Sequence, residues 1–198
     1  MPSRYVRFAP GEYYHFYNRG AGQQAIFLEP DNYLLVLRKV KHYAAGYGIA
    51  IIAYCLMPNH YHFLARQEGD MAAGLLFQHV FNGYTKAFNK RYERSGTLFE
   101  DRFQTRHVDK ESYLIHLCRY IHLNPVKAGL AADPAAWPYS NYLEWIGERS
   151  GKLVDHQFVR DHFRHAADYR QFVYDYLVGS SAPPAGIEAY LLEDGASP

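Results

Sequence analysis

The sequence is poor in cysteine and in long uncharged apolar runs. Its 198 residues include two cysteines, Cys55 and Cys118, and neither belongs to a Cys-x-x-Cys pair. Isolated thiols within apolar stretches are typical of buried cysteines in a reducing compartment, and they argue against a disulfide framework. The longest apolar run, residues 48–57, is about half as long as a membrane-spanning helix. Because residues 1–5 also lack the apolar core of a signal peptide, we expect a cytoplasmic protein with no membrane partner.

Net charge is also low, at +1, but it is unevenly distributed. Residues 1–128 carry 16 Lys and Arg against 10 Asp and Glu, a net charge of +6. Residues 129–198 carry 5 and 10, a net charge of −5. A basic body suits an anionic partner such as a nucleic acid, and the acidic part would then face away from that partner or regulate its binding.

Hydrophobic periodicity predicts a regular order of strands and helices over the first two thirds of the chain. Strands are expected at residues 13–19, 49–57, 60–66 and 103–108, and helices from residue 30 to about 44, from about 71 to 92, and from 111 onward. This β-α-β-β-α-β order is the split βαβ pattern of ferredoxin-like folds. We therefore predict an α+β fold, an antiparallel sheet with helices on one face, to which the helix from residue 111 is added.

Beyond Pro125 the sequence becomes irregular and then helical again. We expect a segment along the surface, followed by helices at about 155–165 and 168–178, as a small C-terminal extension. The predicted divisions are a domain at 1–130, this mostly helical extension at 131–178, and a tail at 179–198. Residues 187–192 are apolar enough to dock against the rest of the protein.

Two histidines, His60 and His62, open the third expected strand directly after a Pro-Asn turn. Side chains two residues apart on a strand point to the same face, about 6 to 7 Å apart along it. Such a pair can clamp one divalent metal ion. Two ordinary half-exposed histidines are the alternative that the spacing alone leaves open.

Tyr120 and Asn124 lie one turn apart on one face of the helix expected from residue 111. A tyrosine hydroxyl beside a metal-bound phosphate can act as a nucleophile. The sequence has 19 tyrosines, so Tyr120 could instead serve only in packing. Asn124 could instead cap a new helical turn that begins at Pro125. By residue type, Tyr84 and Tyr113 are rival nucleophiles.

The stretch from residue 86 to residue 106 is basic and interleaved with aromatic side chains. Cations and exposed rings together suit a nucleic-acid strand, since phosphates need cations and unpaired bases stack. A solvated helix face followed by a core loop is the alternative interpretation. The candidate DNA-binding residues are Lys86, Lys90, Arg91, Arg94, Arg102 and Arg106.

Together these motifs resemble those of a known family. Residues 57–62, Met-Pro-Asn-His-Tyr-His, closely resemble the HUH motif of single-tyrosine transposases. Residues 96–103 are similar to the arginine-bearing turn of the REP-associated branch, residues 119–130 to its catalytic-tyrosine helix, and residues 137–142 to the stretch after it. The likeness covers about residues 13–142, and residues 158–177 resemble a common C-terminal extension. The sequence thus resembles a REP-associated tyrosine transposase of the IS200-like superfamily.

This resemblance implies a metal-dependent enzyme of DNA transposition and recombination. His60 and His62 would bind Mg²⁺ or Mn²⁺, with Asn124 near the metal where related transposases use glutamine. Tyr120 would cleave single-stranded or hairpin DNA, such as a REP hairpin, through a 5′-phosphotyrosine link, and would later rejoin it. The sequence leaves open whether the protein is a monomer or a homodimer.

Two other functions share part of this evidence. A non-catalytic ferredoxin-like module would bind nucleic acid through the basic aromatic stretch alone. A metallohydrolase would combine the His pair with a carboxylate such as Asp101 and would use water as its nucleophile.

Overall fold

The strands and helices follow one another in the order that the sequence predicts. The structure, a computed structural model, describes residues 6–187. Its strands are β1 (Tyr13–Arg19), β2 (Ile49–Met57), β3 (His60–Gln67) and β4 (Gln104–Val108). Its α-helices are α1 (Pro30–Tyr43), α2 (Gly74–Arg91), α3 (Glu111–Lys127), α4 (Tyr142–Trp145), α5 (His156–His162) and α6 (Ala166–Leu177). Short 3-10 turns occur at Ala21–Gln23, Ala45–Tyr47 and Pro134–Ala136.

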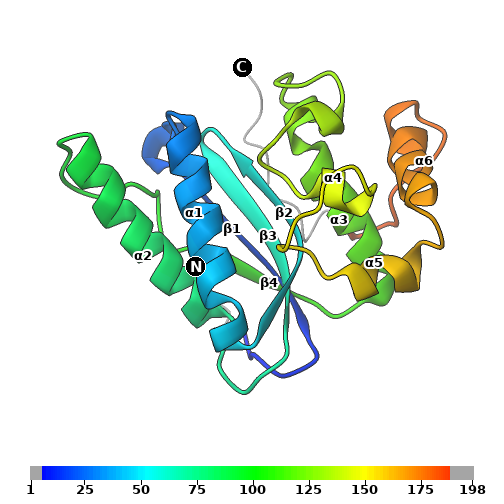
Figure 1. Ribbon diagram of the computed structural model, residues 1–198, viewed down its shortest axis with the longest axis horizontal. Helices are drawn as coiled ribbons and strands as arrows, with labels where there is room; N and C mark the ends of the chain where they lie inside the picture. The colour runs from blue at the N-terminus through cyan, green and yellow to red at the C-terminus, as the bar shows by residue number, and fades with distance from the viewer. Residues whose placement is uncertain (1–5, 188–198) are drawn as a thin grey trace.

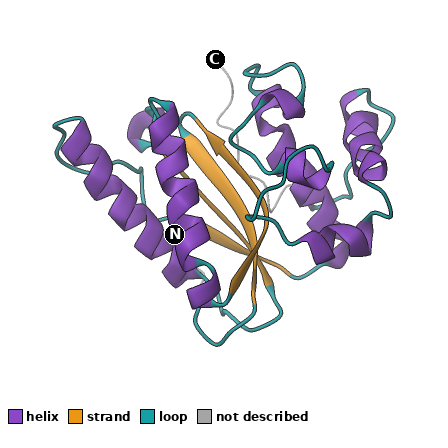
Figure 2. Ribbon diagram, viewed as in Figure 1, coloured by secondary structure: helices purple, strands orange, loops and turns teal. Residues whose placement is uncertain are grey.

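All four strands form one sheet (Figure 2). Their spatial order is β2-β3-β1-β4. Every neighbouring pair is antiparallel, because α1 returns the chain between β1 and β2 and α2 returns it between β3 and β4. The two-residue turn between β2 and β3 places His60 opposite Met57 at the first position of the hairpin. This arrangement confirms the predicted ferredoxin-like sheet.

The two faces of the sheet carry separate hydrophobic cores. On one face, α1 and α2 lie side by side over residues such as Phe16 and Phe63 (Figure 1). On the other face, α3 packs against β2 and joins α4, α5 and α6 in a second core that includes Cys55 and Cys118. The helices of the split βαβ units thus share one face as predicted, and the added helix with Tyr120 covers the opposite one. Both thiols are free and buried, also as predicted.

The C-terminal extension is attached at an irregularity in β2. The β2–β3 register shifts between Ile51 and Ala53, so Ile52 is an extra residue with no partner on β3. The Ile52 carbonyl accepts hydrogen bonds from the Asn141 Nδ2 amide at 2.8 Å and from the Trp145 Nε1 indole at 3.1 Å. The segment expected to run along the surface is therefore buried at its centre, with Asn141 fully enclosed.

Asn141 also connects β2 to α3. Its Oδ1 accepts hydrogen bonds from the Tyr54 backbone N–H at 2.8 Å and from His122 Nε2 at 2.9 Å. The other ring nitrogen of His122 accepts one from the Tyr169 hydroxyl at 2.6 Å, which adds α6 to the network. One buried amide thus holds together the sheet, α3 and the C-terminal helices.

The C-terminal part of the chain is helical as expected. The helices expected at 155–165 and 168–178 are present as α5, which is shorter than expected, and α6, which begins two residues earlier and ends one residue earlier than expected. Ile187 is buried, so the tail docks at this residue, while residues 188–192 lie outside the described residues. Across residues 6–187, no helix is both long and apolar enough to cross a membrane.

Replacing Asn141 with alanine is expected to destabilise the fold by about 3 kcal/mol, because several buried backbone and side-chain groups lose their partner. Urea unfolding of the variant would measure this loss. The exposed Asn82 on α2 is the matched control, and Asn82→Ala should change stability by less than about 0.5 kcal/mol. An Asn141→Ala protein as stable as the control would contradict the role of this network.

The buried ring of His122 makes stability depend on pH. Burial lowers its pKa from 6.5 to about 4, although the hydrogen bond with Asn141 opposes the shift. The unfolded chain therefore binds the proton more readily, so the stability present above pH 6.5 is lost as the pH falls toward 4. The stability difference between wild type and His122→Gln should shrink by up to about 1.4 kcal/mol per pH unit in this range. Urea unfolding at pH 7, 6 and 5 tests this, and a constant difference would refute it.

Candidate active site

The two histidines of β3 point to the face of the sheet that α3 covers. Their ring centroids are 5.1 Å apart and the rings are nearly perpendicular. His62 is completely buried, whereas His60, at the turn, is half-buried. His60 Nδ1 lies 2.7 Å from Asn59 Oδ1, so the Pro-Asn turn also fixes the orientation of the first histidine.

Helix α3 brings Tyr120 and Asn124 to this pair. The Tyr120 ring stands edge-on to the His62 ring, with centroids 5.6 Å apart. Asn124 Nδ2 donates a hydrogen bond to the Tyr120 carbonyl at 2.9 Å, and this bond turns Asn124 Oδ1 toward His60 Nε2, at 3.4 Å. The four residues that the sequence singled out for chemistry therefore form one cluster.

A third histidine, His15 on β1, belongs to the same cluster. Its Nε2 lies 3.0 Å from His62 Nδ1, and the two buried rings are stacked with centroids 5.2 Å apart. The sequence analysis did not select His15, although His15, Tyr17 and Arg19 alternate along β1 and so share the face of the His pair. Burial, with the neighbouring rings of His60 and His15, holds the pKa of His62 well below 6.5, and the ring is neutral at pH 7.

These side chains fit a divalent metal. His62 Nε2 is buried and, like the Tyr61 hydroxyl, has no hydrogen-bond partner among the described residues, so it has the capacity to accept a partner such as a water molecule or a metal ion. A neutral imidazole is the form that binds metal. No three His, Cys, Asp or Glu side chains within residues 6–187 form a metal-binding group, so the protein offers two imidazoles and the amide oxygen of Asn124.

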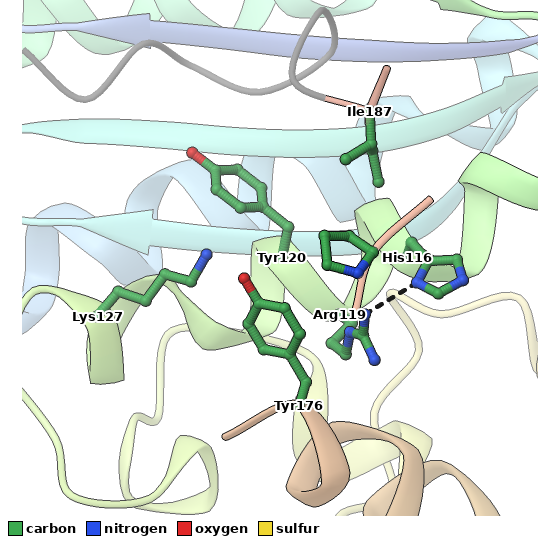
Figure 3. Close-up of a pocket in the computed structure, with 7 residues that line it drawn as sticks. His116, Arg119, Tyr120, Lys127, Tyr176 and Ile187 are labelled. Carbon is green, nitrogen blue, oxygen red and sulfur yellow. Dashed lines mark hydrogen bonds between the residues drawn. The ribbon is translucent and has the colours of Figure 1, made fainter. Parts of the chain in front are cut away.

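Cationic and aromatic side chains line a pocket beside Tyr120 (Figure 3). Lys127, at the last position of α3, has its Nζ 4.9 Å from the centre of the Tyr120 ring and 5.2 Å from that of Tyr176. Arg119 is buried between the rings of Phe172 and Tyr176 and points away from the Tyr120 hydroxyl. Pro183 and Ile187 of the tail complete the walls of a small cavity of about 30 Å³.

Comparison with known protein families identifies the family of this chain. The family model described as "Transposase IS200 like" matches residues 12–124, more than half of the chain and all four clustered residues. The chain belongs to the IS200-like transposase family. No curated protein matches this transposase.

One solved structure shares the fold of the transposase. The structure of a REP-associated tyrosine transposase bound to a REP hairpin is 18% identical, with a TM-score of 0.65. The match covers 78% of this chain and 94% of that one. A crystal structure of a putative transposase from Deinococcus radiodurans R1 is 14% identical over 61% of this chain and 94% of that chain, with a TM-score of 0.41.

The rival tyrosines lie away from the His pair of the transposase. Tyr84 belongs to the core on the opposite face of the sheet, and its hydroxyl donates to the Ile26 carbonyl. Tyr113, near the start of α3, donates its hydroxyl to the Ala185 carbonyl at 2.8 Å. Asp101, the carboxylate of the hydrolase alternative, is exposed and accepts a hydrogen bond from the backbone N–H of Arg102 at 2.7 Å.

The structure divides the six candidate DNA-binding residues between two places. Four of them lie on α2 or just after it, on the helix that covers the sheet face opposite the His pair: Lys86, Lys90, Arg91 and Arg94. Arg91 is paired with Glu29 at 2.5 Å. Arg102 precedes β4, and Arg106 lies on β4 opposite His15 in register, on the same face of the sheet as the His pair. Both are exposed, and neither forms an ion pair within the described residues.

Proposed function

We propose that this transposase cleaves and rejoins single-stranded DNA with Tyr120 as nucleophile and with Mg²⁺ or Mn²⁺ held by His60, His62 and Asn124. The observation that carries this proposal is the edge-on approach of Tyr120 to His62, whose buried Nε2 has no partner in the described chain. A phenol beside a metal site supplies a nucleophile and a phosphate-binding centre at one place.

The bound metal would withdraw negative charge from the scissile phosphate, and phosphate oxygens would complete its coordination. The Tyr120 oxygen then forms a bond to phosphorus and loses its proton, while the bond from phosphorus to the 3′ oxygen breaks and that oxygen gains a proton. The products are a 5′-phosphotyrosine link and a free 3′-hydroxyl. Attack by a 3′-hydroxyl on the same phosphorus reverses the step and joins strands.

The residues around Tyr120 support this chemistry. Lys127 is an exposed cation at the edge of the phenol, where it can contact a phosphate oxygen of the bound strand. The hydrogen bond from Asn124 to the Tyr120 carbonyl keeps the amide and the phenol in a fixed relation on consecutive turns. Since the nucleophile belongs to the protein, no separate base is needed to activate water.

We further propose hairpin-forming single strands as the substrate class. The solved transposase of the same fold is bound to a REP hairpin, and the present chain covers nearly all of that chain. In the present chain, the edge strand β4 carries Arg106 on the same face as the cluster, and Arg102 lies just before that strand. These cations offer contacts to phosphates on the catalytic face.

Incubation with a labelled single-stranded hairpin and Mn²⁺ is expected to give a covalent protein–DNA adduct, seen as a shifted band on a denaturing gel. The adduct should disappear with EDTA and with Tyr120→Phe, because the variant lacks the attacking oxygen. Tyr113→Phe is the matched control and should retain the adduct. Adduct formation by Tyr120→Phe would sink the proposal, and hairpins that bind without ever forming an adduct would favour a non-catalytic binding module.

Arg106→Ala should weaken hairpin binding several-fold and reduce the slope of log K against log salt by about 1, the effect of losing one phosphate contact. Arg91→Ala should change binding much less, because Arg91 is already paired with Glu29 on the other side of the sheet. Fluorescence anisotropy at several salt concentrations measures both variants. A larger loss for Arg91→Ala than for Arg106→Ala would show that DNA lies along α2 instead.

A further inference from the structure

His15 and His62 are joined by a hydrogen bond that lies wholly inside the protein. Both side chains are fully buried, and 3.0 Å separates His15 Nε2 from His62 Nδ1. The rings are stacked at an interplanar angle of 18°, and the Tyr17 ring packs against both, with centroids 4.9 Å from His15 and 6.1 Å from His62. Neither ring can therefore rotate away without disturbing the packing between β1 and β3.

The direction of this bond decides what the other nitrogen of His62 can do. A neutral imidazole carries one proton, so a ring that donates from Nδ1 has a lone pair on Nε2, and a ring that accepts at Nδ1 has a proton there. An unsatisfied donor and an unsatisfied acceptor both carry a penalty when buried, but a metal ion can satisfy only the lone pair and never an Nε2–H. A lone pair on Nε2 is the form that a metal ion requires.

We propose that His15 is a positioning residue that accepts the Nδ1 proton of His62 and thereby keeps the Nε2 lone pair of His62 ready for the metal. This inference rests on the proposed function of the His pair and adds a residue to it. His15 does not bind the metal itself, because its Nε2 bonds to the far side of the His62 ring. Partners of this kind commonly set the tautomer of a metal-binding histidine and change metal affinity by about 10- to 100-fold.

The tautomer can be read directly in the wild-type protein without metal. Nitrogen-15 NMR of the imidazole rings at pH 7, assigned with His62→Ala, is expected to show a protonated Nδ1 and an unprotonated Nε2 on His62. A proton on Nε2 of His62 would overturn the proposal, whatever the enzyme does with DNA.

Metal binding supplies the second readout, with Mn²⁺ alone followed by electron paramagnetic resonance. His15→Leu should weaken Mn²⁺ binding by about 10- to 100-fold. His15→Gln should retain most of the affinity, because its amide oxygen can accept the same hydrogen bond. His107→Gln is the matched control, since His107 is exposed on β4, bonds to Glu12 and lies on the other face of the sheet. Wild-type affinity in a folded His15→Leu protein, or equal losses in the Leu and Gln variants, would overturn the proposal.

The outcome for His15 is separable from that for the transposase chemistry. If the NMR and Mn²⁺ results hold while no covalent adduct forms, the proposed DNA cleavage fails and the role of His15 stands. If adducts form but His62 carries its proton on Nε2, the reverse is true. Mn²⁺ that binds wild type and His62→Ala equally would overturn the metal site and the role of His15 together.

Discussion

The position of the clustered residues of α3 depends on the buried hydrogen bond between His122 and Asn141. Residues on an α-helix are about 100° apart, so His122 points away from the side on which Tyr120 and Asn124 lie. Fixing His122 on Asn141 therefore fixes the rotation of α3 about its axis. Because Asn141 is itself held by the backbone of β2, the phenol and the amide face the His pair on the adjacent strand. A rotation of α3 would break the contact between Asn124 Oδ1 and His60 Nε2 and move the Tyr120 ring away from His62.

Strand β1 serves both faces of the sheet at once. Its central residues alternate, with Tyr14 and Phe16 in the core under α1 and α2, and His15 and Tyr17 beside His62. The strand also pairs with β3 on one side and β4 on the other. It is thus the element through which the strand of the His pair, β3, and the edge strand β4 keep a constant relation.

Most of the fold could be predicted because its elements are marked locally. The apolar run of β2, the Pro-Asn turn and the helical spacing along α1 and α2 each indicate their structure without knowledge of distant residues. The extra residue at Ile52 could not be predicted, because its carbonyl is satisfied by Asn141 and Trp145, about ninety residues away. Tyr120 and Asn124 were expected on one face of the helix, and both are buried because that face lies against the His pair of β3, while α6 and the tail line the other side of Tyr120.

The same distinction applies to the site. The His pair could be found because two-residue spacing on a strand has a direct geometric meaning, and the pairing of Tyr120 with Asn124 follows from one helical turn. Only the resemblance to a family selected Tyr120 among the tyrosines. Lys127 lies three residues after Asn124 and was within reach of the same helical argument. The pairing of Arg91 with Glu29, which sets this cation apart from Arg106, depends on the packing of α1 against α2 and has no local sign.

The two separate cores have a consequence for how such a protein can diverge. Under α1 and α2 the requirement is apolar volume, and groups of core residues can be exchanged there together with little effect on the far side of the sheet. Under α3, residues of the core both pack and make polar contacts, so a substitution there must preserve volume and hydrogen bonding together. The solved structure at 18% identity and a TM-score of 0.65 retains the fold while sharing few residues with this chain. The core under α1 and α2 can therefore vary more freely than the core under α3, where polar contacts must also be kept.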